Sequence, residues 1–527
     1  MAYPEPTEVA PWYLRNITQA LELNSTTGQV FVRTGLASGG NIIITGNVTI
    51  PGEIDTHITA IGSLANISTP YMPIGGNVIV SSGNITAVVS GTVAVSSIAG
   101  NVTVVDGGGS ITVDGNVNAT ITGGNVATTI GGTNLDAFGR LRVSEPYTLF
   151  DSQNLYIDGD QFANLTANSG TVTYVANQSS FDLAVTAANG SSVIRQCRTT
   201  QAYQPGKSLL TMNTFAMATL IAGCRQRVGY FTAANGVYFE ADGETLYLVI
   251  RSSTTGTVVE ERIAQSSWNG DRLTGAGGAT NPSGITLNPT LTQILWSDIE
   301  WLGVGNVRAG FVINGVFIVC HTFQHANQSG NTTVYMTTAT LNPRYEITNT
   351  SATGGARTMK QICSTVISEG GYNPQTKINY VPTAIAPTRI TTGNVFTSLA
   401  SIRLNPAYPD AVVVPSQIDL LLVDVQYGTF QLVLNASNVV ANTGSWSNAV
   451  SSVVQYNSSA LRIGDGTVVY SGLTSSRDTL AISEDLKRRL QLSRTANGTP
   501  DILTLCVAYQ SNNADLLWKF GWEELTN

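Results

Sequence analysis

The sequence predicts an all-β protein made of a repetitive β shaft, a two-sheet β-sandwich and a second mainly β domain. Charged residues make up 11% of the 527 residues, against about 25% in an ordinary soluble domain. Hydrophobic residues make up 42%, which is too many for a disordered chain. Short apolar alternations separated by Gly and Asn recur along the chain, which is the pattern of strands joined by tight turns.

Residues 1–39 are interpreted as a docking peptide that contains a short helix. Apolar side chains recur there at mostly three- and four-residue spacing: Trp12, Leu14, Ile17 and Leu21. Pro11 stands where a proline can open a helix. We expect these four side chains to dock on another protein, or the helix to pack on its own chain.

Residues 40–132 carry a repeat of Gly-Asn-Val or a close variant, with Gly at positions 46, 76, 83, 91, 100, 115 and 124. No charged residue occurs from Thr56 to Val105. The pattern predicts very short strands separated by turns in which Gly and Asn take positive φ. Such strands must stack on one another or on other chains, which favours an intertwined trimeric fibre or a β-solenoid. A flexible linker is the alternative.

Residues 133–379 predict a β-sandwich of the jelly-roll, lectin-like type. Strands are expected at 170–176, 209–214, 245–251, 258–263, 294–301, 307–313 and 316–321. Asn314-Gly315 predicts a type I′ hairpin turn between the last two strands.

Residues 380–527 predict a second, mainly β domain after a proline-containing hinge at 380–387. Strands are expected at 418–425, 429–434, 467–470 and 502–509.

The charge balance argues against nucleic acid as a partner. The chain has 26 basic and 34 acidic residues, for a net charge of −8, and shows no basic footprint for phosphates. No apolar run of about 18 residues predicts membrane insertion, and the acidic, proline-rich first residues do not predict a signal peptide. The five widely spaced cysteines are expected to be free thiols of a protein folded in a reducing cytoplasm.

No cofactor, metal or catalytic residue is predicted. Of the three histidines, His321 and His325 are four residues apart around a strand end, and no third ligand is evident. Cys320 and His321 are neighbours on a strand and point to opposite faces, which argues against a catalytic dyad.

The segment 296–301 is the candidate ligand site. On a strand, Trp296, Asp298 and Glu300 point to one face. Retaining glucanases of the jelly-roll type are similar, with Glu, Asp and Glu on that face, but here Trp296 replaces the nucleophile. We therefore interpret Trp296, Asp298, Glu300 and Trp301 as ligand-binding residues of a carbohydrate-facing groove, with purely structural acids or a hydrolase as alternatives.

Several segments resemble a family of phage virion structural proteins that is common in tailed phages of aquatic bacteria such as cyanophages. The resemblance covers roughly 134–350 and rests on residues 136–144 (DAFGRLRVS), 146–152 (PYTLFDS), 203–208 (YQPGKS), 226–231 (QRVGYF), 300–305 (EWLGVG), 310–315 (GFVING) and 325–327 (HAN). It implies a virion component and a fibre.

These observations together predict a non-enzymatic, homotrimeric virion fibre assembled in the host cytoplasm. Its N-terminus would bind other virion proteins of the capsid, neck or tail, and its sandwiches would contact host-surface glycans. A tailspike-type glycan hydrolase that uses Asp298 and Glu300 is one alternative. A capsid or neck cement protein without host contact is another.

Overall fold

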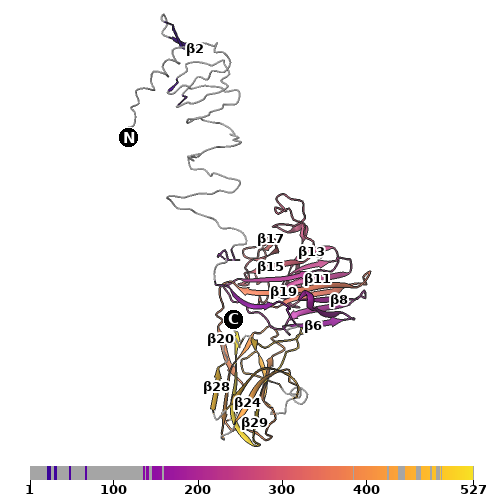
Figure 1. Cartoon of the computed structure of the whole chain (residues 1–527), viewed down its shortest axis with the longest axis vertical. Coiled ribbons are helices and arrows are strands. Elements are labelled where there is room, and N and C mark those ends of the chain that lie inside the picture. Colours follow the sequence, from indigo (N-terminus) through magenta and orange to yellow (C-terminus); the bar gives the residue numbers. More distant parts are fainter. Residues whose placement is uncertain are drawn as a thin grey trace, which may run out of the picture. The chain divides into compact units, whose positions relative to one another are not determined.

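The computed structural model divides into two compact units, Met1–Gly124 and Asn125–Asn527, and each is described by itself. The described residues are 21–24, 29–32, 47–48, 66–67, 135–136, 138–141, 145–156, 160–383, 385–423, 427–436, 446–458, 464–474, 477–481, 487 and 489–525. Regular structure in these ranges is almost entirely β, as the sequence predicts (Figure 1). None of the helices in these ranges has the length and apolar character to cross a bilayer.

The first unit contains two short strand pairs. β1 (Leu21–Asn24) and β2 (Gln29–Val32) form an antiparallel pair with Leu21 opposite Val32. The helix expected for this segment is therefore wrong at Leu21, because the β-prone run Val30-Phe31-Val32 pairs with it. Trp12, Leu14 and Ile17 lie outside the described residues.

The second strand pair lies in the repeat region. β3 (Asn47–Val48) and β4 (Asn66–Ile67) pair in parallel, with Asn47 opposite Asn66 and Val48 opposite Ile67. The register thus places an Asn-aliphatic pair opposite a second Asn-aliphatic pair. The rest of 40–132 lies outside the described residues, and association into a trimer stays a prediction.

The second unit begins with a two-sheet antiparallel sandwich. One sheet has eight strands: β5 (Tyr147–Ser152), β7 (Thr171–Val175), β8 (Ser180–Val185), β10 (Leu209–Ala216), β15 (Gln293–Ile299), β16 (Val307–Ile313), β17 (Val316–Phe323) and β19 (Arg357–Ser368). The other has seven: β6 (Phe162–Ala167), β9 (Ser192–Cys197), β11 (Cys224–Phe231), β12 (Gly236–Asp242), β13 (Thr245–Ser252), β14 (Val259–Ala264) and β18 (Pro343–Asn349). The chain passes repeatedly from one sheet to the other, which is a jelly-roll type of winding.

The two-sheet sandwich and its strands follow the sequence pattern closely. Each strand expected between 170 and 321 overlaps an observed one. The β16–β17 hairpin turns at Asn314 (φ 52°) and Gly315 (φ 77°), the two positive φ values that a type I′ turn needs. Alternate residues of both sheets face one shared core, with Phe215, Phe239 and Phe311 fully buried in it.

A second sandwich follows. Its five-stranded sheet contains β20 (Thr376–Tyr380), β21 (Thr388–Ile390), β23 (Val413–Leu422), β28 (Arg477–Ala481) and β30 (Ala514–Leu525). Its six-stranded sheet contains β22 (Thr397–Leu404), β24 (Gly428–Leu434), β25 (Ser447–Asn448), β26 (Val454–Asn457), β27 (Thr467–Thr474) and β29 (Leu503–Tyr509). A separate apolar core lies between them and includes Leu420, Leu505 and Trp522.

The five cysteines are free, in agreement with the sequence. Four are buried: Cys197, Cys224, Cys320 and Cys506. Burial raises the pKa of each of these thiols. These cysteines therefore act as small apolar core residues.

A tight loop at residues 135–141 packs on the first sandwich. Asp136 closes it, because its carboxylate accepts hydrogen bonds from the backbone N–H groups of Phe138 (2.9 Å) and Arg140 (2.8 Å). The Arg140 side chain adds an ion pair to Asp136 (2.7 Å) and donates to the Gly206 carbonyl (2.9 Å). Asp136 is buried, so the loop depends on its carboxylate.

We expect Asp136→Ala to destabilise the first sandwich, because the substitution leaves two backbone N–H groups and a guanidinium without their acceptor. The expected loss of unfolding free energy is about 2–3 kcal/mol. Urea denaturation followed by tryptophan fluorescence measures it. Asp160→Ala, which removes an exposed carboxylate, is the control and is expected to cost less than about 1 kcal/mol. Equal effects of the two variants would contradict this role for Asp136.

Candidate functional site

The segment predicted to bind a ligand lies on β15 in the eight-stranded sheet. Leu295 and Ile299 face the shared core, so Trp296 and Asp298 face outward, as the strand period requires. Both outward residues are nevertheless fully buried, with 0% exposure. The outward face of this sheet is therefore covered at β15.

Asp298 is held by a cross-strand ion pair. It lies opposite Arg308 on β16, and the Arg308 guanidinium donates to its Oδ2 through Nε (3.0 Å) and Nη2. The same Nη2 donates to the backbone carbonyl of Leu135. Arg308 thus links the acid of β15 to the loop at 135–141, and this loop is part of the cover.

Glu300 and Trp301 follow the end of β15 and are half-buried. Burial raises the pKa of Glu300, and the nearby Asp136 carboxylate acts in the same direction. The Trp301 indole N–H donates to the Met336 carbonyl (3.1 Å), and its ring packs edge-on against Tyr203 at 5.8 Å. The two side chains are held in place by the loop contacts around them.

The four residues Trp296, Asp298, Glu300 and Trp301 thus lie together in the structure. Their side chains differ in solvent exposure. The indole N–H of Trp296 donates to the Ile318 carbonyl (3.3 Å), beneath the surface. Glu300 and Trp301 keep some exposure. The ligand-binding role of the four residues stays a prediction, and Glu300 and Trp301 are the members that a ligand could reach.

The outward face of the seven-stranded sheet carries an ion-pair network that the sequence reasoning missed. Arg227 donates to Glu240 (2.7 Å) and to Glu346 (3.0 Å) from the strand between them. Arg251 and the Tyr238 hydroxyl both donate to Glu260 (2.7 and 2.8 Å). Burial opposes the ionisation of Glu260, but these hydrogen bonds outweigh it and lower its pKa. Each acid of the network is paired with an arginine. The network therefore neutralises the charges on this face of the sheet.

The two histidines named as metal candidates have other contacts. His321 is buried, its Nδ1 accepts the backbone N–H of Asn269 (3.2 Å), and burial lowers its pKa to about 4. The His325 ring stacks on Tyr335 at 3.9 Å, and its Nδ1 lies 2.7 Å from the Gly305 carbonyl. In the ranges given above, no group of three or more His, Cys, Asp or Glu side chains is arranged to hold a metal ion.

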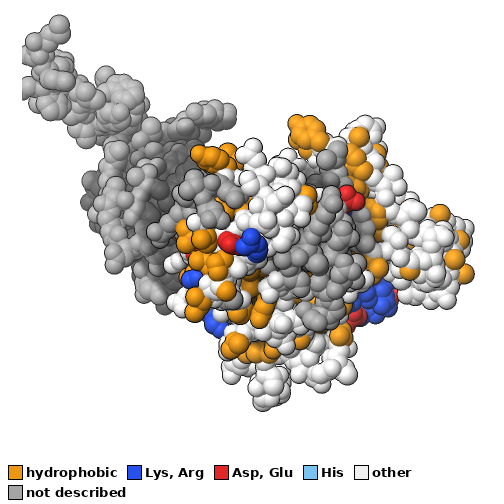
Figure 2. All heavy atoms as spheres, turned by 90° about the horizontal axis from the view of Figure 1, so that it is seen from below, with side chains coloured by type: hydrophobic (Ala, Val, Ile, Leu, Met, Phe, Trp, Pro, Cys, Tyr) orange, Lys and Arg blue, Asp and Glu red, His pale blue; other side chains and the backbone are white. Residues whose placement is uncertain are grey.

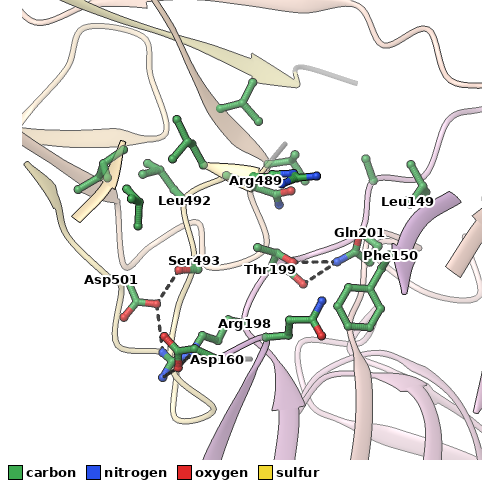
Figure 3. A pocket seen from close by; sticks show the side chains of 18 of the residues that line it. Leu149, Phe150, Asp160, Arg198, Thr199, Gln201, Arg489, Leu492, Ser493 and Asp501 are labelled. Atoms are coloured by element: carbon green, nitrogen blue, oxygen red, sulfur yellow. Dashed lines mark hydrogen bonds and ion pairs between the residues drawn. The ribbon is translucent and has the colours of Figure 1, made fainter. Parts of the chain in front are cut away.

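A pocket of about 690 Å³ lies between the two sandwiches (Figure 3). Both domains line it, with Thr148, Leu149, Phe150, Asp151, Asp160, Gln161, Arg198, Thr199, Gln201, Ala202 and Tyr372 from the first sandwich and its exit, and Val412, Val414, Leu434, Val469, Arg489, Leu490, Gln491, Leu492, Ser493, Asp501 and Leu503 from the second. This pocket could not be predicted from the sequence, because its walls are more than 300 positions apart in places.

One end of the pocket is a junction between the domains. Asp501 accepts hydrogen bonds from Ser493 (2.6 Å), Asn435 (2.9 Å) and Arg198 (3.3 Å). Arg198 also donates to Asp160 (3.0 Å). The dashed lines around Asp501 in Figure 3 mark part of this cluster. These polar groups are engaged with one another and join the two sandwiches.

No protein-family model matches the chain, and no curated protein matches it in sequence. Solved structures resemble part of the chain. The CBM2 module of the evolved Dit of Lactobacillus casei BL23 phage J-1 is 7% identical, covers 43% of this chain and 98% of its own, and has a TM-score of 0.27. The β-glucanase of Bacillus licheniformis is 10% identical over 41% and 96% of the two chains (TM-score 0.24), and the carbohydrate recognition domain of Emp47p is 7% identical over 43% and 98% (TM-score 0.27). Values this low support no argument about function.

Asp298→Asn is expected to destabilise the first sandwich by about 3 kcal/mol, because it removes a buried carboxylate from Arg308. Glu300→Gln, a matched change at a half-buried position on the same face, is expected to cost less than about 1 kcal/mol. Chemical denaturation of both variants measures the difference. Equal stability of the two variants would contradict the structural importance of the Asp298–Arg308 pair.

His321 makes the unfolding free energy depend on pH. Its folded-state pKa of about 4 lies below the value of about 6.5 for an unfolded chain. Its contribution is therefore fully present above pH 6.5 and is lost as the pH falls from 6.5 towards 4, by up to about 3 kcal/mol. Denaturant titrations at pH 7, 5.5 and 4.5 are expected to show this loss in the wild type and a smaller loss in His321→Gln. Identical pH profiles would refute the assignment to His321.

Proposed function

We propose that this chain is a structural protein of a tailed-phage virion, a trimeric fibre that is attached through residues 1–39 and presents its β-sandwiches to glycans of the host surface. It acts without catalysis. The proposal unites the repeat region, the resemblance over 134–350 and the paired sandwiches in a single architecture.

The observation that carries the proposal is the parallel pairing of β3 and β4. The register sets Asn47 opposite Asn66 and Val48 opposite Ile67, so like residues are paired with like residues. A linker has no need of such a register, whereas a fibre shaft is built by repeating it. The apolar members of the repeat then have a place to be buried when neighbouring rungs or chains associate.

The surface of the second unit supports contact with an uncharged, hydroxyl-rich ligand. Figure 2 shows one face of the molecule, on which the described residues display white and hydrophobic atoms and only a few charged side chains. Amides and hydroxyls can both donate and accept hydrogen bonds. Such a surface suits sugars better than it suits a polyanion.

The geometry of β15 favours binding over hydrolysis. A retaining hydrolase needs two available carboxylates about 5–5.5 Å apart. Asp298 is buried and paired with Arg308, so Glu300 is the acid of the pair that a substrate could reach. The raised pKa of Glu300 suits a general acid and is the one observation that favours the hydrolase alternative.

The purified full chain is expected to sediment as a trimer and to bind host-surface polysaccharide without releasing reducing ends. Analytical ultracentrifugation, a pull-down on immobilised polysaccharide and a reducing-sugar assay measure the three properties. A monomer would refute the fibre, and the absence of any polysaccharide binding would refute host contact. Cleavage that is lost in Glu300→Gln would replace the proposal with the hydrolase.

A further inference from the structure

We infer that the pocket between the two sandwiches binds a saccharide that carries a carboxylate group. This inference rests on the proposed function, since it names the place and the chemical class of the glycan contact. The size of the pocket, its walls and a described lining cation outside the domain junction point to this ligand.

The pocket has the size of a ligand site. Its volume of about 690 Å³ lies within the range of roughly 300–1,000 Å³ that small-molecule sites occupy. It also lies at a domain interface, where such sites are common. A short oligosaccharide fits these dimensions.

The walls combine apolar and polar surface in similar amounts. Leu149, Val412 and Leu492 contribute aliphatic surface, and Tyr372 adds an aromatic ring that is stacked on Tyr147 at 5.2 Å and 5°. The apolar part can pack on the C–H faces of sugar rings, while the polar groups can set the orientation of a ligand.

The lining arginines differ in what they do. Arg198 is committed to Asp160 and Asp501 at the domain junction. Arg489 is exposed, and among the described residues it has neither an ion pair nor a hydrogen bond. In the view of Figure 3, Arg489 lies apart from the Asp501 cluster. The pocket therefore offers a cation that is available to a ligand.

A guanidinium selects for a planar anion. Its parallel N–H donors match the two oxygens of a carboxylate. The Thr199 hydroxyl is also near: its Oγ1 accepts from Gln201 Nε2 (3.0 Å) and lies 3.5 Å from Cys197 Sγ, where either atom could be the donor. A uronate offers both a carboxylate and hydroxyl oxygens, whereas a neutral sugar would leave the Arg489 charge unused.

The test compares methyl β-glucuronide with methyl β-glucoside, which lacks only the carboxylate, by calorimetry and saturation-transfer NMR on the full chain. The glucuronide is expected to bind at least about tenfold more tightly. Arg489→Gln is expected to remove that preference. Arg389→Gln, the same change at an exposed arginine that pairs with Asp515 (3.3 Å) outside the pocket lining, is expected to keep it. Thr148→Trp, which fills the pocket from an exposed lining position, is expected to abolish binding of both sugars.

Equal affinity for the two sugars, no binding of either, or a preference that survives Arg489→Gln would overturn the inference. The pull-down on host polysaccharide separates this failure from failure of the proposed function. If polysaccharide binding persists in Arg489→Gln and Thr148→Trp, the glycan contact is real but lies elsewhere on the chain. Circular dichroism and the denaturation midpoint establish that each variant is folded.

Discussion

The stability of the first sandwich depends on how the charged side chains on the outward faces of its two large sheets are neutralised. Alternation along each strand sends half of the side chains away from the shared core, and many of those outward residues are charged. Asp298 with Arg308, and Arg227 with Glu240 and Glu346, neutralise these charges in pairs. A charge left alone there would cost several kcal/mol. Low overall charge thus coexists with ion pairs in which one partner is often buried, as Asp298 and Glu240 are.

Strand positions and turns could be predicted because local chemistry decides them. Asn314 and Gly315 specify their turn through positive φ, and the apolar alternation around them specifies the flanking strands. The docking helix failed at Leu21 for a related reason. Three- and four-residue spacing favours a helix, but the β-prone run Val30–Val32 pairs with residues from Leu21 onward as a strand.

The burial of the candidate site could not be predicted, because segments that are distant in the sequence cover it. Burial of Asp298 involves Leu135, 173 positions from Arg308 in the sequence, and the Asp136 motif gave no sign that it forms a loop. The pairing of Asp298 with Arg308 could have been found, since the hairpin register places one opposite the other. The pocket needs two domains, and its Arg198–Asp501 contact joins residues 303 positions apart.

The pairing of β30 fixes an order of events during synthesis. β30 pairs with β20, β21 and β23, so the five-stranded sheet lacks its central member until residues 514–525 have left the ribosome. The strands of the first sandwich all lie within residues 147–368, so this sandwich can close earlier, since domains fold as units as they emerge. During that interval the strands of the second sandwich expose unpaired edges, which are templates for wrong pairing. In the proposed trimer, three copies growing close together would be most exposed to such exchange at this stage.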